Sequence, residues 1–104
     1  MQDNRRNFSD NEKQMLYDEV NGRCPMCGRR LTHKKDGKIF KTFEIAHIYP
    51  ANPRPEEITL LVKEKRLSDD VNNLKNLIAV CRICHKVFDT PRTIDEYRSW
   101  VRLK

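Results

Sequence analysis

Two pairs of cysteines are the residues of this sequence whose chemistry is easiest to name. Cys24 and Cys27 are separated by two residues, as are Cys81 and Cys84, and 53 residues lie between the pairs. Two-residue spacing lets both thiolates of a pair point at one ion, and two such pairs complete a tetrahedral four-sulfur zinc site. With all four sulfurs bound, the zinc would be structural and not catalytic. We therefore predict a zinc ion that holds residue 24 beside residue 84.

Two other uses of the cysteines are less consistent with the sequence. Disulfides form in oxidising compartments, but the polar stretch 1–10 is no secretory signal. A redox-active pair is the other alternative, and the presence of two pairs in one short chain argues against it. No apolar run approaches the length of about 20 residues that a membrane span needs. We expect a cytoplasmic protein with no membrane partner.

A bound zinc ion would also help to stabilise a chain as short as this one. The chain has 104 residues, of which 38% are hydrophobic and 35% are charged. Such a chain forms one small domain, 1–104, that buries too little apolar surface to be comfortably stable alone. Zinc binding would supply the missing folding free energy.

The surplus positive charge is concentrated in one window. The formal charge is +6, and residues 23–41 carry all of it, because the rest of the chain holds equal numbers of acids and bases. Such a stripe suits a polyanion, although a solvated surface that aids solubility is the alternative. The residues expected to contact phosphates are Arg29, Arg30, Lys34, Lys35, Lys38 and Lys41.

Local patterns predict the elements that must position these groups. A capping box beginning at Ser9 predicts a helix over 10–21, and a second one beginning at Thr93 predicts a helix over 94–103. Asp36-Gly37 predicts a hairpin turn. Between these features we expect a strand at 42–48, a short helix at 56–66, a polar turn at 69–76, a buried strand at 77–80, and a helix over 81–89 that Pro91 ends.

Three further residues lie close to the predicted strands and the second cysteine pair. His47 ends the strand Phe43–Ile48, Asn76 stands five residues before Cys81, and His85 follows Cys84 directly. In this order and spacing, AHI…NLIAVCRICH resembles the HNH endonucleases, which are ββα-metal nucleases, and in particular their zinc-stapled branch. The resemblance covers about residues 24–89.

The resemblance implies a fold and an activity. The fold would be a small α+β domain with a core over about 22–90, in which a β-hairpin and a helix surround a catalytic metal, a four-cysteine zinc site staples the chain, and helices flank the core. The activity would be metal-dependent hydrolysis of DNA, double-stranded and with little sequence preference of its own, since the basic residues would contact phosphates. A protein partner or a regulatory domain would control such a nuclease.

The resemblance also implies roles for individual residues. His47 would be the general base that activates water, and imidazole suits this role because its ordinary pKa lies near 6.5. His85 would bind Mg²⁺ or Mn²⁺, which would take up the developing negative charge. Asn76 would brace the loop that carries His47.

One position departs from the family pattern. Many members carry a metal-ligating Asp or His directly before the base, and here that residue is Ala46. Asp89 lies four residues after His85 and would share its helical face, whereas Glu44 would share the strand face of Ala46. We favour Asp89 as the second ligand. Glu44 has only the support of a looser similarity to nucleases of bacterial defence.

Two other functions remain compatible with these residues. The first is a non-catalytic zinc-ribbon module that binds nucleic acid or a protein, with Ala46 marking the loss of the second metal. The second is an HNH nuclease that cleaves RNA.

Overall fold

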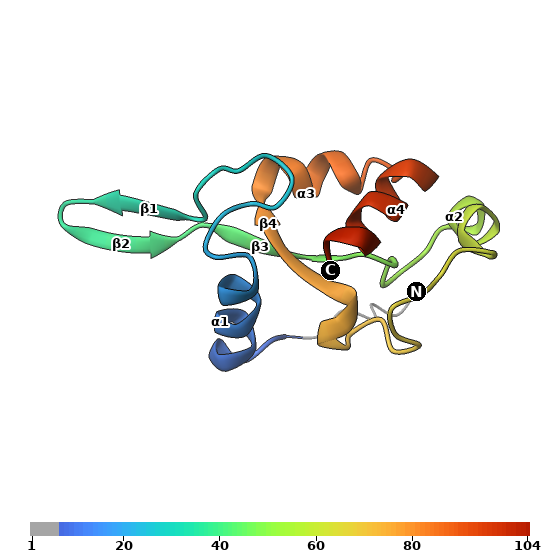
Figure 1. Ribbon diagram of the computed structural model, residues 1–104, viewed down its shortest axis with the longest axis horizontal. Coiled ribbons are helices and arrows are strands. Elements are labelled where there is room, and N and C mark those ends of the chain that lie inside the picture. Colours follow the sequence, from blue (N-terminus) through green and yellow to red (C-terminus); the bar gives the residue numbers. More distant parts are fainter. Residues whose placement is uncertain (1–6) are drawn as a thin grey trace.

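A computed structural model describes residues 7–104 and has the predicted α+β fold, with two short antiparallel sheets and four helices in that part of the chain (Figure 1). The described part is elongated, with extents of 48 × 26 × 22 Å. No helix within it has the length and apolar character of a membrane span.

The first helix, α1 (Asp10–Glu19), begins at the predicted capping box. The Ser9 side chain accepts a hydrogen bond from the backbone N–H of Glu12, and the Glu12 carboxylate accepts one from the backbone N–H of Ser9. The helix is shorter than the predicted 10–21 because Asn21 and Gly22 adopt positive φ angles of 55° and 69°. Gly22 is required here, since a Cβ atom would lie 2.7 Å from the hydroxyl oxygen of Tyr17.

Two β-strands follow and form a hairpin that projects from the body of the molecule (Figure 1). Strand β1 (Thr32–Lys35) pairs with β2 (Lys38–Lys41) across the predicted turn. Asp36 and Gly37 both have positive φ, as the tight two-residue turns that match the strand twist require.

The second sheet contains the predicted ββα core. Strand β3 (Phe43–His47) pairs antiparallel with β4 (Leu77–Cys81), and the short 3₁₀ helix η1 (Leu74–Asn76) leads into β4. All five residues of β4 are buried, because α1 and α3 (Arg82–Phe88) both pack against this sheet. The apolar run Leu-Ile-Ala-Val is therefore the centre of the core.

The remaining helices complete the fold. Helix α4 (Ile94–Leu103) begins at its predicted capping box and buries Trp100, whose ring stacks on Phe88 at 3.8 Å between centroids. Helix α2 (Pro55–Leu61) starts near its predicted position but ends five residues earlier than 66. Leu61 is buried whereas Val62 is 71% exposed, so no packed face supports further turns.

Candidate functional site

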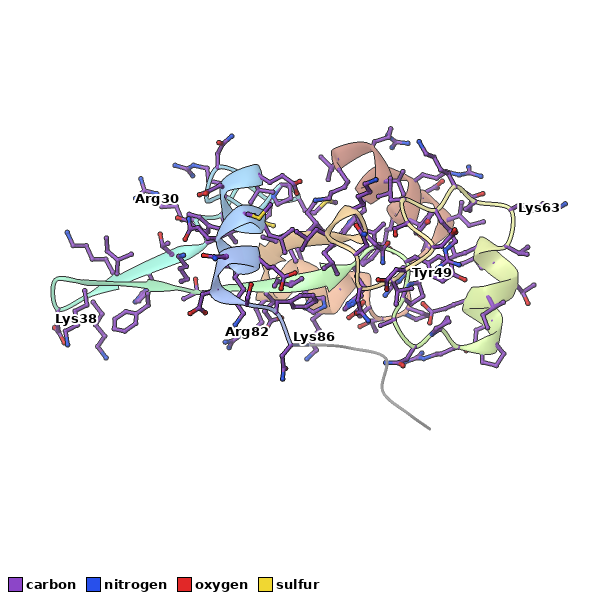
Figure 2. All side chains as sticks on the ribbon, turned by 90° about the horizontal axis from the view of Figure 1, so that it is seen from below. Arg30, Lys38, Tyr49, Lys63, Arg82 and Lys86 are labelled. Atoms are coloured by element: carbon purple, nitrogen blue, oxygen red, sulfur yellow. The ribbon has the colours of Figure 1, made fainter. Side chains whose placement is uncertain are left out.

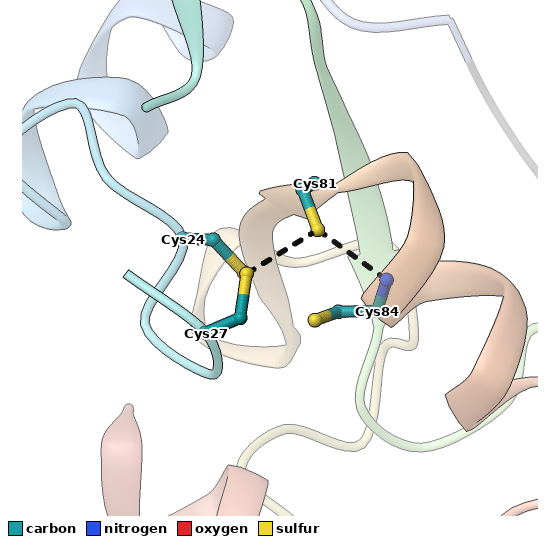
Figure 3. A group of neighbouring side chains, drawn as sticks. All are labelled: Cys24, Cys27, Cys81 and Cys84. Atoms are coloured by element: carbon teal, nitrogen blue, oxygen red, sulfur yellow. Dashed lines mark hydrogen bonds between the residues drawn. The ribbon is translucent and has the colours of Figure 1, made fainter. Parts of the chain in front are cut away.

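The four cysteines meet at one point, as predicted (Figure 3). All four sulfurs lie within 4.8 Å of one another, and the Sγ atoms of Cys27 and Cys81 are 3.7 Å apart. A tetrahedral site with Zn–S bonds of about 2.3 Å places its sulfurs about 3.8 Å apart. The cluster can therefore hold a metal ion such as zinc.

The protonation behaviour of the thiols agrees with a cationic occupant. Burial raises the pKa of Cys24, but backbone hydrogen bonds from Cys81, Cys27 and Met26 outweigh it and lower the pKa to about 7. Burial raises the pKa of Cys84, and the neighbouring thiols of Cys81, Cys27 and Cys24 raise it further. One thiolate thus forms readily and discourages ionisation of its neighbour, a conflict that a divalent cation removes.

The cluster joins two distant parts of the chain. The first pair lies in a tight knuckle, where Gly28 N–H donates to the Cys24 carbonyl and Cys24 N–H donates to the Arg29 carbonyl. Cys81 ends β4 and caps α3, and its sulfur accepts a hydrogen bond from the N–H of Cys84. A metal here would fix the corner between β4 and α3 against the knuckle, directly before His85.

His47 is the last residue of β3, and its register partner is Leu77. It is 9% exposed, and it lines a cavity of about 340 Å³. Its Nε2 atom lies 3.0 Å from the side-chain oxygen of Asn72. With that oxygen as the acceptor, Nε2 carries the proton and Nδ1 is the nitrogen that can accept one. No sequence motif predicted this contact of Asn72.

Asn76 is fully buried at the end of η1. Its side-chain oxygen accepts from the backbone N–H of Tyr49 at 2.8 Å, and its amide donates to the carbonyls of Tyr49 and Val71 at 3.0 and 2.9 Å. The backbone N–H of Ile48 also donates to the Asn76 carbonyl. Asn76 thus fixes the two residues that follow His47 and the loop that carries Asn72.

His85 lies on α3 between two carboxylates. Its Nδ1 atom is 2.8 Å from Glu44 Oε1, and its Nε2 atom is 3.1 Å from Asp89 Oδ2. The hydrogen bond with Asp89 and, after it, the one with Glu44 raise the pKa of His85 against the opposing effect of burial. Both candidate second ligands therefore contact His85, but at opposite nitrogens.

The two carboxylates differ in what they face. His47, His85 and Asp89 all line the 340 Å³ cavity, and Glu44 is not among its lining residues. Glu44 instead lies 3.6 Å from the guanidinium of Arg82. His85 and the Asp89 carboxylate thus line the same space as His47, with Nε2 of His85 toward Asp89 and Nδ1 toward Glu44.

Arg92 is a buried residue that lines the same cavity and that no sequence motif predicted. It is 5% exposed and donates to the carbonyls of His47 and Ile48 at 3.2 and 2.9 Å. It also contacts Asp89 at 2.5 Å and Glu57 at 3.4 Å. Burial lowers the pKa of Arg92, and the two carboxylates oppose that effect. The only sequence signal for Arg92 is its position three residues after Asp89, which is compatible with contact between the two side chains.

The predicted phosphate contacts do not all have the same surroundings. All six are exposed, and for five of them, Arg29, Arg30, Lys34, Lys35 and Lys38, no contact with a helix is seen within residues 7–104. Lys41 is turned toward α1, where its ammonium contacts the side-chain oxygen of Gln14 and lies 5.2 Å from the ring centre of Tyr17.

Comparison with known protein families gives one match. A family model described as HNH endonuclease matches residues 24–93, which is about two thirds of the chain. The matched segment contains both cysteine pairs, the four residues that line the cavity with imidazole or carboxylate groups (His47, Glu57, His85 and Asp89), and Arg92. No curated protein matches the chain.

Proposed function

This chain belongs to the HNH endonuclease family, and from that membership we propose that it hydrolyses phosphodiester bonds of DNA with His47 as the general base. The observation that carries the proposal is the shared cavity, in which a histidine held by Asn72 faces a second histidine and a carboxylate. This arrangement supports a proton acceptor and a set of metal-binding groups around one space.

The base chemistry follows from the tautomer of His47. The side-chain oxygen of Asn72 accepts a hydrogen bond from Nε2–H of His47, so Nδ1 takes the proton of the attacking water. The water oxygen forms a bond to phosphorus while the bond from phosphorus to the 3′ oxygen breaks, and solvent returns a proton to the departing 3′ oxygen. Asn76 and Arg92 hold the backbone at and after His47, so they position the base without touching the reacting atoms.

The residues around His85 fit a divalent ion. Its Nε2 atom and the Asp89 carboxylate are the groups that would hold Mg²⁺ or Mn²⁺ on the cavity side. The bound ion would supply positive charge against which negative charge on the phosphate can develop. The second oxygen of Asp89 is held by Arg92, which restricts the carboxylate to one orientation.

Glu44 has a different part in this proposal. A histidine that binds a metal through one nitrogen commonly donates its other N–H to a carboxylate, which fixes the ring. Glu44 occupies that place, because it contacts Nδ1 of His85 and lies outside the cavity lining. We therefore assign Asp89 as the ligand and Glu44 as the residue that orients His85, and Ala46 needs no replacement on β3.

The test is plasmid cleavage by the zinc-loaded protein with Mg²⁺ or Mn²⁺. Loss of a general base typically costs about 10² to 10⁴-fold in rate, so His47→Ala should abolish visible nicking while zinc content and melting temperature stay close to wild type. Lys63→Ala, an exposed residue remote from both the cavity and the hairpin, is the control and should still nick. Cleavage by His47→Ala at the wild-type rate would contradict the mechanism.

The missing ligand at Ala46 favours one competing function, a zinc module that binds without cleaving. Titration of Mn²⁺ into zinc-loaded protein separates the two functions. A nuclease should show a second metal site that disappears in His85→Ala, whereas the binding module should show none. Parallel digestion of DNA and RNA duplexes decides between the two substrates.

A further inference from the structure

The β1–β2 hairpin has side chains that packing against the rest of residues 7–104 does not explain. Residues 33–41 are all exposed, and among them Ile39 is 71% and Phe40 is 49% exposed. A two-stranded hairpin with no packed face has little stability of its own. Ile39 and Phe40 on β2 therefore do not contribute to the hydrophobic core. Their exposure indicates that the hairpin surface binds another molecule.

The strand register sorts the hairpin residues onto two faces. Cross-strand partners share a face, so His33 lies opposite Phe40 and Lys35 opposite Lys38 on one face, while Lys34 lies opposite Ile39 on the other. Each face therefore combines ammonium groups with one exposed apolar side chain. Lys35 and Lys38 are like charges directly across the ladder, which is unfavourable unless an anion lies between or beside them.

We propose that the β1–β2 hairpin is a DNA-binding ribbon that enters the major groove of the substrate duplex. This inference rests on the proposed function and names its substrate as B-form DNA. The major groove is about 12 Å wide and admits a two-stranded β-ribbon, whereas the minor groove is about half as wide. The lysines reach the phosphates on both walls. The ribbon lies with one face on the groove floor, so Phe40, which shares its face with Lys35 and Lys38, contacts thymine methyl groups there.

The same geometry selects DNA over RNA. The major groove of A-form RNA is deep and too narrow for side chains to read, so the ribbon has no place to enter there. The basic hairpin thus favours one of the two substrates that the sequence leaves open.

The distance from the hairpin to the active site fixes where the ribbon binds. Only Thr42 separates β2 from β3, and the two strands follow one direction along the longest axis (Figure 1). Phe40 precedes His47 by seven residues, and at about 3.3 Å per residue this is about 23 Å, or about seven base pairs of duplex. The protein should therefore protect DNA on one side of the cut to that distance.

Basic side chains continue from the hairpin toward the active site. A groove of about 500 Å³ at the hairpin base is lined by Arg29, Arg30, His33 and Arg82, among others. Figure 2 shows Lys38, Arg82 and Lys86 along one edge of the molecule. A single phosphate backbone can follow this edge between the two contacts.

A second copy of the chain is the other partner that an open hairpin could bind, through its free strand edges. Lysines along an edge oppose such pairing. Both strands carry them, at Lys34 and Lys35 on β1 and at Lys38 and Lys41 on β2.

The first arm of the test measures affinity for a 30-base-pair duplex by fluorescence anisotropy, with zinc-loaded His47→Ala as the parent so that no cleavage occurs. Lys34, Lys35 and Lys38 are changed together to Gln. Loss of three phosphate contacts should reduce the salt slope of binding by about 2.7 and weaken binding about 10²-fold near 0.15 M salt. The matched control changes three exposed lysines elsewhere, Lys63, Lys65 and Lys75, of which Lys63 lies at the opposite end from Lys38 (Figure 2).

The second arm tests the groove contact itself. Replacing thymine by uracil removes only the major-groove methyl, and each lost contact should weaken binding about fourfold. This loss of affinity should vanish in Ile39→Ser/Phe40→Ser. An RNA duplex of the same sequence should bind the parent and the lysine variant with similar affinity.

The outcomes are distinguishable. Equal affinities of the lysine variant and its control, or indifference of the parent to uracil, would overturn the ribbon. A change of oligomeric state in the hairpin variants on size-exclusion chromatography would assign the hairpin to self-association and also overturn it. Plasmid nicking by the wild-type chain tests the nuclease separately, so an active enzyme that binds without its hairpin would refute only this inference. Unchanged melting temperatures exclude misfolding, because these side chains are exposed.

Discussion

Removal of the Asn76 side chain should test whether Asn76 positions His47 without taking part in the reaction itself. Asn76→Ala leaves the N–H and C=O of Tyr49 and the C=O of Val71 without their side-chain partner. Asn76 is fully buried, and each such loss costs about 1 to 3 kcal/mol. The sum, about 3 to 9 kcal/mol, is a large part of the free energy of unfolding of about 5 to 15 kcal/mol that small domains have.

The assay is urea unfolding of the zinc-loaded protein, followed by circular dichroism. Asn76→Asp keeps the acceptor for the N–H of Tyr49 but turns an oxygen toward two carbonyls, so it should destabilise at least as much as Asn76→Ala although the volume is preserved. Asn73→Ala is the matched control, because the exposed Asn73 caps one N–H of η1 and should cost about 1 kcal/mol.

The kinetic readout distinguishes positioning from general structure. Where Asn76→Ala is still folded, kcat should fall while KM changes little, since the substrate contacts are intact and only the placement of His47 is altered. A loss of stability below about 1 kcal/mol, or an unchanged kcat in the folded variant, would refute the bracing role.

Three further outcomes follow from the metal sites. Zinc removal by a chelator, or Cys84→Ser, should abolish the cooperative unfolding transition in circular dichroism, because metal binding contributes folding free energy. Glu44→Gln should weaken Mn²⁺ binding about 10 to 100-fold in an electron paramagnetic resonance titration, without removing a ligand. In protein without Mg²⁺ or Mn²⁺, NMR should show the His85 pKa above its ordinary value and lower in Asp89→Asn. Because the folded pKa is the raised one, this stabilisation is complete below about pH 6.5 and is lost as pH rises through the folded value.

Much of the fold was predictable because local signals and long-range packing agree. Two capping boxes give the starts of α1 and α4, and Asp36-Gly37 gives the hairpin turn. The cysteine spacing identifies the knuckle and the β4–α3 corner, and the cluster confirms it. These features depend on a few neighbouring residues, so the sequence alone carries them.

The features that could not be predicted from the sequence are contacts between segments that lie far apart in the chain. The end of α2 depends on which apolar side chains find a packed partner, and Val62 finds none in the core. Asn72 reaches His47 across 25 residues, and Arg92 reaches its carbonyl across 45. Lys41 looked like the other lysines of the basic window, yet its position beside α1 sets it apart. Such pairings arise from how the elements pack, and no local pattern encodes them.

The substitution at Ala46 can be understood from the source of the proposed ligands. His85 and Asp89 are four residues apart on α3, so one helix supplies both groups, and the strand need supply only the base. Their alignment with His47 then depends on how firmly α3 is held against β3. Ala46 is fully buried on the strand face that Glu44 shares, and a side chain this small lets the helix approach closely. Cys84 precedes His85, so a metal in the sulfur cluster anchors the first turn of the same helix. A larger residue at position 46, as in Ala46→Val, should therefore weaken Mn²⁺ binding and kcat through displacement of α3, although it touches no ligand.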